Sequence, residues 1–400
     1  MKTTLYTTAL TTFLALTITF TTAQPDLRTN PNTLTIATFN CEFLWDGEEP
    51  EEGYSNATFP HKGSQTAAEE HMQEIAEVII RNNPDIITLA EVENLDALNT
   101  FNSKFLSGRG YRTYFIQGGD DNTGQDVCLL TRIDPLTDQI YRTDEKGESG
   151  NIQKSVTKNY YAKFEVNGQK FAIIGLHFLS VPDDQSKKFK RQAQADAIKQ
   201  LAVDLQDEGY ALVVTGDFND FDGDPDCLDI NMNLPITTVL IDIKKVDVAD
   251  ESDNLTNVCS FIPRMDRFTS HHDKTNKGYV DYTEEFSSID HILVSPSLMN
   301  YFDEAWIDHT HDPLSVSDHF PLVVRFKFDE DDIINPIIIE SLLPNPSGTE
   351  NMEEAVTLKN ISNDPIDLTG WKLKDLAGRT WSLDELGVIQ PGESNLNNSQ

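Results

Sequence analysis

The sequence predicts a mixed α/β domain over residues 30–328, followed by a small β module over residues 337–400. Alternating polar and apolar residues predict a strand at Thr33–Asn40. Apolar residues at helical spacing predict a helix that begins near Thr66, at a capping-box pattern, and ends before Pro84. From residue 337 onward, Pro, Asn and Gly interrupt short apolar runs, which is typical of a β-sandwich. The length of 400 residues agrees with two domains.

The other elements of the first domain follow from local patterns. A second helix is predicted at Ser186–Glu208, where Gly209 ends it, and Asn167-Gly168 predicts a tight hairpin. Apolar or alternating runs predict further strands at Ile86–Glu91, Tyr111–Gln117, Asp126–Thr131, Asn159–Val166, Gln169–Leu176, Ala211–Thr215, Ile289–Ser295 and Leu322–Phe328. In the second domain, strands are predicted around Val356–Leu358 and Trp371–Leu373.

The beginning of the chain predicts export. Residues 1–23 combine a short basic start, an apolar stretch at Leu5–Phe20 and small residues at Thr21-Thr22-Ala23, which is the pattern of a signal peptide. A retained N-terminal anchor is the alternative. No other segment approaches the ~18 apolar residues of a membrane-spanning helix. We therefore expect a secreted protein, extracellular or at the cell surface, without a membrane span. An acidic linker is predicted at residues 329–336.

The formal net charge of −35 argues against a basic groove that holds nucleic acid through many phosphate contacts. If the substrate is a polyanion, bound divalent cations must supply much of the local positive charge. The general alternative is that the charge serves solubility.

Four cysteines are present without a CxxC spacing, so a structural zinc site is not expected. Cys227 and Cys259 lie in polar, loop-like sequence and are the better candidates for a disulfide. Cys41 and Cys128 lie in apolar strand-like runs and are expected in the core.

Polar side chains able to bind metal or move protons stand where the apolar strands stop or start. One such residue is usually a turn residue, but the repetition at separate strand ends indicates a hydrolytic site. Glu91 and Asp318 have the oxygen ligands that a hard cation such as Mg²⁺ or Ca²⁺ prefers. The residues are Asn40, Glu91, His177, Asp217, Asn219, Asp290, His291, Asp318 and His319.

The same residues lie in sequence blocks that resemble the endonuclease/exonuclease/phosphatase superfamily, whose members include DNase I and the apurinic endonucleases. The blocks stand in the order of the family and are TFNCEFLW, LAEVEN, LHFLS, TGDFND, SIDHILVS and SDHFP. The resemblance implies a four-layered α/β sandwich, in which two mixed sheets pack face to face with helices outside. It also implies a hydrolase that acts on phosphate esters.

The resemblance further implies a role for each matched position. Asn40 and Glu91 would lie at the metal, with Glu91 as the main ligand, and Asp318 would be a further carboxylate of the metal site. The metal would be Mg²⁺, with Mn²⁺ or Ca²⁺ as alternatives. Asp217 would hold the attacking water, and Asn219 would help to place the water and the phosphate.

The histidines complete this implied set. His319 would contact the phosphate and act in proton transfer, with Asp290 as its orienting partner. His177 matches the histidine that DNase I-like members use as a second acid/base or phosphate contact. That match favours a diesterase.

A basic cluster follows His177 at the start of the second predicted helix, formed by Lys187, Lys188, Lys190 and Arg191. In so acidic a chain it is the best local candidate for a phosphate-binding patch, with a solvated helix face as the alternative. Arg191 and Gln194 also resemble an Arg-x-x-Gln feature of secreted bacterial members of the family. Arg191 is therefore predicted to bind substrate.

The C-terminal segment is similar to the lamin-tail domain, on the residues EEAVTLKN, DLTGWKLKD and PGE. That domain is an immunoglobulin-like β-sandwich found beside secreted bacterial nucleases, and the segment looks incomplete. It implies contact with a cell surface or matrix.

The pairing of the two domains favours an extracellular nuclease, with DNA favoured over RNA as the partner. The alternatives are a phosphatase or phospholipid phosphodiesterase, of the inositol phosphatase or sphingomyelinase kind, and an inactive adhesion protein.

Overall fold

The computed structural model describes the chain in several stretches. The predicted export signal at residues 1–23 and the predicted linker at residues 329–336 lie outside them. None of the described helices is long and apolar enough to cross a membrane. The described residues are 26–48, 61, 63–119, 124–246, 253–272, 279–280, 285–328, 337–343, 355–360, 365–369, 371–374 and 380–398.

The first of two central sheets has six strands in the order β14-β15-β1-β2-β4-β3. β1 and β2 run parallel, and the other neighbours run antiparallel, so the sheet is mixed. The strands are β1 (Thr33–Leu44), β2 (Ile86–Val92), β3 (Arg112–Phe115), β4 (Asp126–Thr131), β14 (Phe302–Ile307) and β15 (Leu322–Lys327).

The second sheet has five strands in the order β10-β13-β9-β8-β7, with β8 parallel to β9. The hairpin between β7 and β8 is confirmed, because Asn167 and Gly168 both adopt positive φ, at 49° and 73°, as a tight hairpin turn requires. The strands are β7 (Lys158–Val166), β8 (Gln169–His177), β9 (Ala211–Asp217), β10 (Thr256–Asn257) and β13 (Asp290–Val294).

The two sheets face each other across a shared apolar core. Ile36, Ile86 and Leu129 of the first sheet belong to the same buried cluster as Ile173 and Val213 of the second. These positions alternate with residues that face outward, as the two-residue period of a strand requires. The expected pair of mixed sheets is therefore present.

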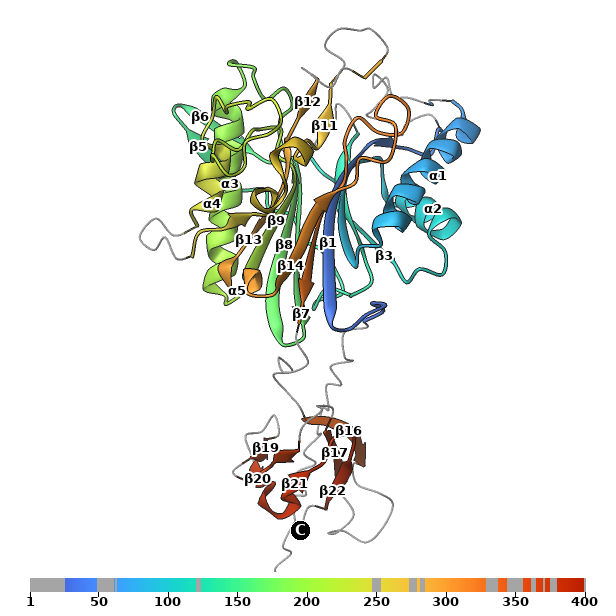
Figure 1. The fold of residues 1–400 in the computed structure, drawn as a ribbon, viewed down its shortest axis with the longest axis vertical. Helices are drawn as coiled ribbons and strands as arrows, with labels where there is room; N and C mark the ends of the chain where they lie inside the picture. Colours follow the sequence, from blue (N-terminus) through green and yellow to red (C-terminus); the bar gives the residue numbers. More distant parts are fainter. Residues whose placement is uncertain are drawn as a thin grey trace, which may run out of the picture.

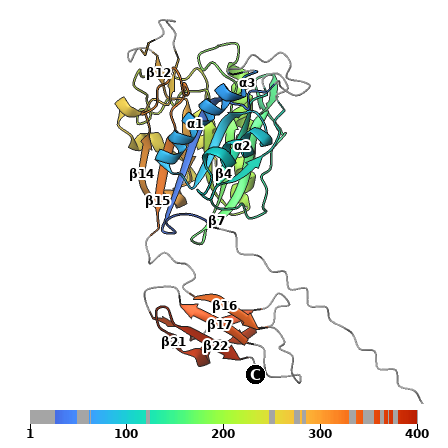
Figure 2. The same ribbon diagram turned by 90° about the vertical axis from the view of Figure 1, so that its right-hand side faces the viewer.

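Helices cover the outer faces of both sheets (Figures 1 and 2). Helices α1 (Gln65–Asn82) and α2 (Leu95–Phe105) share a buried cluster with the outer side of the first sheet. Helices α3 (Lys188–Asp207) and α4 (Val239–Lys244) do the same for the second sheet. A short helix, α5 (Pro296–Met299), follows β13.

The first helix begins earlier than its predicted start at Thr66. Ser64 is the N-cap, and its side chain accepts a hydrogen bond from the Ala67 amide at 3.3 Å. Asn83, in the left-handed conformation with φ 49°, ends the helix before Pro84. The capping-box assignment was therefore wrong by two residues, while the end of the helix was correct.

Small elements surround the edge of the sheets that carries the candidate site. They are the hairpin of β5 (Lys146–Ser149) and β6 (Ile152–Ser155), and the pair formed by β11 (Ser270–His271) and β12 (Phe286–Ser287).

The C-terminal segment forms a small β region with its own core of Leu358, Leu368, Leu383 and Ile389. Three antiparallel strands lie in the order β16-β17-β22. Two further pairs join β18 to β21 and β19 to β20. The strands are β16 (Ile337–Leu343), β17 (Ala355–Asn360), β18 (Ile366–Asp367), β19 (Lys372–Lys374), β20 (Thr380–Ser382), β21 (Val388–Ile389) and β22 (Ser394–Asn398).

Candidate active site

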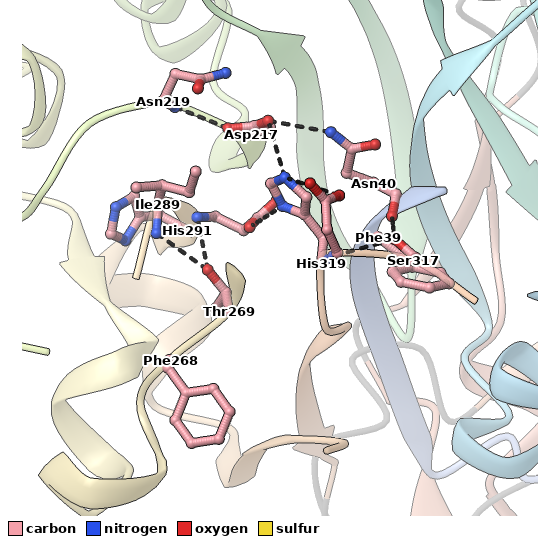
Figure 3. Close-up of polar contacts among 12 residues, drawn as sticks. Phe39, Asn40, Asp217, Asn219, Phe268, Thr269, Ile289, His291, Ser317 and His319 are labelled. Carbon is pink, nitrogen blue, oxygen red and sulfur yellow. Dashed lines mark hydrogen bonds and ion pairs between the residues drawn. The ribbon is translucent and has the colours of Figure 1, made fainter. Parts of the chain in front are cut away.

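The predicted site residues meet at one edge of the two packed sheets. Asn40 and Glu91 lie near the carboxyl ends of β1 and β2, and His177 and Asp217 end β8 and β9. The antiparallel strands β13 and β15 bring Asp290 and the preceding segment of His319 to the same edge. Figure 3 shows Asn40, Asp217 and His319 pointing toward one another from three different segments.

Asp217 lies at the centre of this arrangement and is buried. Its Oδ2 accepts a hydrogen bond from Nδ2 of Asn40 at 3.2 Å, and its Oδ1 accepts one from the Asn219 amide at 2.8 Å. Burial and the neighbouring Asp290 carboxylate raise the pKa of Asp217 to about 7. The carboxylate is thus fixed in place and able to exchange a proton near neutral pH.

His319 is held by Asp290, with Nδ1 and Oδ2 2.7 Å apart. Burial alone would lower the pKa of His319, but the carboxylates of Asp290, Asp318 and Asp217 outweigh burial and hold this pKa well above its usual value. The Nε2 atom of His319 lies 3.9 Å from Oδ2 of Asp217. A protonated imidazole therefore faces the central carboxylate.

His177 approaches the same oxygen from the second sheet. Its Nε2 lies 3.4 Å from Oδ2 of Asp217, and its buried Nδ1 has no hydrogen-bond partner among the described residues. Burial, with the positive charge of Lys158, lowers the pKa of His177 well below its usual value. The 3.4 Å contact is therefore that of a neutral ring with a carboxylate rather than an ion pair.

Three further carboxylates, Glu42, Glu91 and Asp318, are electrostatic neighbours near Asn40. Oε1 of Glu91 accepts a hydrogen bond from Asn40 at 3.2 Å, and Oε2 of Glu42 accepts one from the Asp318 amide at 2.9 Å. Burial and the charge of Asp318 raise the pKa of Glu91, and the same causes raise the pKa of Glu42 to about 7. These carboxylates repel one another, so their chemistry fits a divalent cation with oxygen ligands.

Glu42 was not singled out from the sequence, although it lies inside the block that contains Asn40. Glu42 and Phe43 adopt positive φ of 47° and 69°, and the pairing of β1 with β2 shifts register between Asn40 and Leu44. Glu91 also has positive φ, at 62°, at a register shift between β2 and β4. Irregularities of this kind re-aim side chains and collect at functional sites.

Two further side chains that the sequence reasoning missed support Glu91 from behind. Nε2 of Gln125 donates to Oε2 of Glu91 at 2.8 Å, and Nζ of Lys158 donates to Oε1 of Gln125 at 3.2 Å. Gln125 and Lys158 are both buried. They stand at the starts of β4 and β7 rather than at strand ends, where the sequence predicts most of the site residues.

A second group could hold a metal ion among the residues that the structure describes. Ligand atoms of Asp217, Asp290 and His319 lie within 4.8 Å of one another, and Oδ1 of Asp290 is buried with no hydrogen-bond partner in the described part of the chain. Nδ1 of His319 is already occupied by Asp290, however, and a protonated histidine is not a ligand. By their chemistry, the oxygen ligands of Glu42, Glu91 and Asp318 suit a hard cation, whereas the ligand atoms that lie within 4.8 Å of one another are those of Asp217, Asp290 and His319.

The sequence model of the Endonuclease/Exonuclease/phosphatase family matches residues 37–319, which contain the whole site. The chain belongs to this family. A model of the Lamin Tail Domain matches residues 334–396. The chain is thus a hydrolase of phosphate esters with a C-terminal lamin-tail domain. Comparison with functionally curated proteins gives no match.

Solved structures with a similar fold include three members of varied activity. A 3′ phosphatase from Neisseria bound to a product DNA hairpin is 18% identical, with 74% of this chain and 100% of that chain covered and a TM-score of 0.49. An AP endonuclease from Archaeoglobus fulgidus is 18% identical, with coverage of 73% and 99% and a TM-score of 0.46. A mannosyl-6-phosphatase from Bacteroides thetaiotaomicron is 17% identical, with coverage of 73% and 98% and a TM-score of 0.43.

Within this family domain, Arg191 does not lie where a substrate-binding residue was expected. Its side chain is completely buried, and each guanidinium nitrogen is hydrogen-bonded to the protein. The basic cluster therefore divides: Lys190 is exposed on α3, whereas Arg191 faces inward. In the described structure Arg191 has no surface through which to touch a substrate.

The acidic loop after Asp217 is held by hydrogen bonds to other segments of the domain. Asp222 is buried and accepts hydrogen bonds from Nζ of Lys244, at 2.9 Å, and from Nδ2 of Asn257, at 2.9 Å. The Lys244 ammonium group neutralises the charge of Asp222, and the two contacts hold the loop in place.

Cys227 and Cys259 are both buried thiols, and their side chains are in hydrogen-bond contact. Cys41 and Cys128 are buried in the core of the first sheet, as expected. The two cysteines predicted as the better disulfide candidates therefore lie in contact, and in this structure both are free thiols.

Proposed function

We propose that this family member is a secreted, divalent-metal-dependent phosphodiesterase that cleaves nucleic acid, with DNA favoured over RNA. The observation that carries the proposal is the approach of two histidine Nε2 atoms, at 3.4 and 3.9 Å, to the same oxygen of Asp217. Hydrolysis of a diester needs a base for water, a donor to the phosphoryl oxygen and a donor to the leaving oxygen. His177, Asp217 and His319 supply one group for each.

Asp217 acts as the base in this proposal. Its pKa of about 7 lets it accept a proton from the attacking water near neutral pH. Asn40 and the Asn219 amide hold its two oxygens, so the carboxylate presents a fixed edge. The Asn219 side chain, at a positive φ of 48°, helps to place the water and the phosphate.

The two histidines act as donors. His319 stays protonated beside Asp290 and donates from Nε2 to a phosphoryl oxygen. His177 has a lowered pKa, so its ring is neutral near pH 7, and in this proposal its Nε2–H donates a hydrogen bond to the leaving oxygen. His177 matches the histidine of the DNase I-like members, which favours a diester over a monoester.

Glu42, Glu91 and Asp318 would hold the divalent cation, with Mg²⁺ preferred and Mn²⁺ or Ca²⁺ as alternatives. When bound there, the cation supplies charge neutralisation at the phosphate. Since the chain carries a net charge of −35, this neutralisation is also what would let a polyanion approach.

Export and the C-terminal domain enter the proposal through the sequence. The signal-like residues 1–23 support secretion, and the lamin-tail domain, which we propose to be an immunoglobulin-like sandwich, supports contact with a cell surface or matrix. The arrangement of Asp217, Asp290 and His319 argues against an inactive adhesion protein, because adhesion does not require a buried acid–base group.

A substrate panel tests the proposal. The purified protein is incubated with Mg²⁺ or EDTA and with single- and double-stranded DNA, RNA, sphingomyelin, a phosphoinositide and p-nitrophenyl phosphate. We expect Mg²⁺-dependent cleavage of DNA, slower cleavage of RNA and little hydrolysis of the other substrates. Faster hydrolysis of the monoester or of a phospholipid would replace the nuclease by a phosphatase or a phospholipid phosphodiesterase.

A further inference from the structure

Arg191 of α3 and Asp220, which follows β9, form an ion pair in which Nε and Oδ2 lie 2.8 Å apart and both side chains are completely buried. Removing two charges from water costs more than their attraction returns unless other hydrogen bonds complete the pair. A pair of this kind therefore indicates a need for a defined geometry rather than for stability. The pair contacts two segments of the molecule.

One part is the segment that directly follows His177. Nη1 of Arg191 donates to the carbonyl oxygens of Leu179, at 3.3 Å, and Val181, at 3.1 Å, and Nη2 donates to that of Pro182, at 2.6 Å. One turn further along α3, Oε1 of Gln194 accepts a hydrogen bond from the Leu179 amide at 3.1 Å. The helix thus holds both backbone groups of Leu179.

The segment needs this support because of Val181. Val181 adopts φ 70°, in the left-handed region, which is costly for a β-branched residue. The planar fork of arginine reaches the carbonyl groups of Val181 and of residues on either side of it. A single ammonium group could not reproduce that pattern.

The other part is the loop that follows Asp217. Asp220 lies three residues after Asp217, and its Oδ2 also accepts a hydrogen bond from Oγ1 of Thr237 at 2.6 Å. Its carbonyl oxygen lies 2.9 Å from Nε2 of His291, the residue next to Asp290 on β13. Asp220 is therefore fixed from three sides behind the catalytic residues.

The two segments are joined a second time, at the site itself. The Phe178 amide donates to the carbonyl oxygen of Asp217 at 2.9 Å, and Nδ2 of Asn219 donates to that of Phe178 at 3.2 Å. His177 and Asp217 are directly paired across β8 and β9. Each segment thus begins at a catalytic residue, His177 or Asp217. A few residues further along the chain, both segments contact Arg191.

We propose that the Arg191–Asp220 pair is a positioning pair that fixes the segment after His177 against the loop after Asp217, and so sets the geometry of the catalytic groups. The inference rests on the proposed hydrolytic function of the site. Arg191 touches no substrate in this role.

The variant Arg191→Lys tests the pair, because lysine keeps the charge beside Asp220 but loses the fork to the backbone carbonyls. With bis(p-nitrophenyl) phosphate and saturating Mg²⁺, we expect kcat to fall about ten- to a hundredfold while KM stays within about twofold. Lys199→Met, which alters a charge further along α3, is the control and should leave both constants unchanged. A rise in KM at constant kcat would mean direct substrate binding and would overturn the proposal.

Asp220→Asn gives a second test that preserves shape and a hydrogen-bond acceptor, in case the lysine variant does not fold. A variant that melts at a lower temperature with an unchanged kcat would assign the pair to stability alone and would also overturn the proposal. Amide hydrogen exchange separates this inference from the activity. Faster exchange at residues 178–183 in the variants is expected even if the wild-type protein hydrolyses none of the substrates offered. Unchanged exchange there would show that the Arg191–Asp220 pair does not fix this segment.

Discussion

Nδ1 of His319 and Oδ2 of Asp290 lie 2.7 Å apart, although Asp290 belongs to β13 of the second sheet and His319 lies just before β15 of the first. β13 delivers Asp290, and the segment before β15 delivers His319. The contact therefore joins the two halves of the sandwich at the catalytic edge. It also keeps the imidazole protonated and turns its Nε2 toward Asp217.

Asp290→Asn should reduce kcat about a hundredfold, because asparagine keeps an acceptor for Nδ1 but removes the charge that holds His319 protonated. NMR titration of the His319 ring should show a lower pKa in this variant. Asp303→Asn, a surface carboxylate paired with Arg325, is the control. An unchanged His319 titration would show that Asp290 does not set its protonation.

Glu42→Gln should weaken the apparent affinity for Mg²⁺ at least about tenfold, because the variant removes one of the three carboxylates that we propose to hold the cation. Activity measured as a function of Mg²⁺ concentration gives this affinity directly. Glu70→Gln, on the exposed side of α1, should behave as the wild type. If the Glu42 variant has the same Mg²⁺ dependence as the wild type, the cation does not lie at this group.

The stability of the fold should decrease on mild acidification because of His71. Burial lowers the pKa of His71 from 6.5 to about 4, and its Nε2 lies 3.1 Å from the carbonyl oxygen of Cys41. Between these pH values the unfolded chain binds a proton that the folded chain does not. The histidine thus contributes stability above pH 6.5 that is lost as the pH falls toward 4, by up to about 3 kcal/mol.

Urea unfolding at pH 7.5 and at pH 5, for wild type and His71→Gln, measures this contribution. Glutamine keeps a donor for the Cys41 carbonyl group but does not titrate, so the variant should lose less stability on acidification. The other histidines are the same in both proteins and cancel in the comparison. An equal loss in the two proteins would contradict the assignment.

Cys227 and Cys259 should form a disulfide when the protein is exposed to an oxidant such as oxidised glutathione, because their thiols are already in contact. The intact mass, measured without reduction, should be lower by about 2 Da, the mass of the two hydrogens lost. Cys227→Ser should abolish the change, whereas Cys41→Ser should not. Alkylation of all four thiols after such oxidation and unfolding would refute the pairing.

Much of the site could be predicted because its residues end strands. Neighbouring parallel strands place their carboxyl ends at one edge, so the pairing of β1 with β2 brings Asn40 to Glu91, and that of β8 with β9 brings His177 to Asp217. The packing of the two sheets then brings the two pairs together. Glu42 follows a different rule. It lies within β1 and reaches the site only because φ turns positive there, which the sequence does not reveal.

The missed elements are those with weak periodicity. α2 has only Ala97, Leu98 and Phe101 buried, so its apolar pattern is short. β14 is an edge strand with no fully buried residue, and its pattern is too polar to indicate a strand. Arg191 was predicted to lie on the surface because a basic cluster on a helix usually does. Its buried ion-pair partner, Asp220, lies in a loop that is distant in the sequence.

The most direct test of the account compares plasmid DNA treated with the wild-type protein and with Asp217→Asn, each with Mg²⁺ and with EDTA. Asparagine keeps the shape of residue 217 but cannot accept a proton from water. We predict nicking by the wild type in Mg²⁺, and at least a hundredfold less by the variant. Equal nicking by both proteins, or nicking by the wild type in EDTA, would contradict a metal-dependent reaction in which Asp217 is the base.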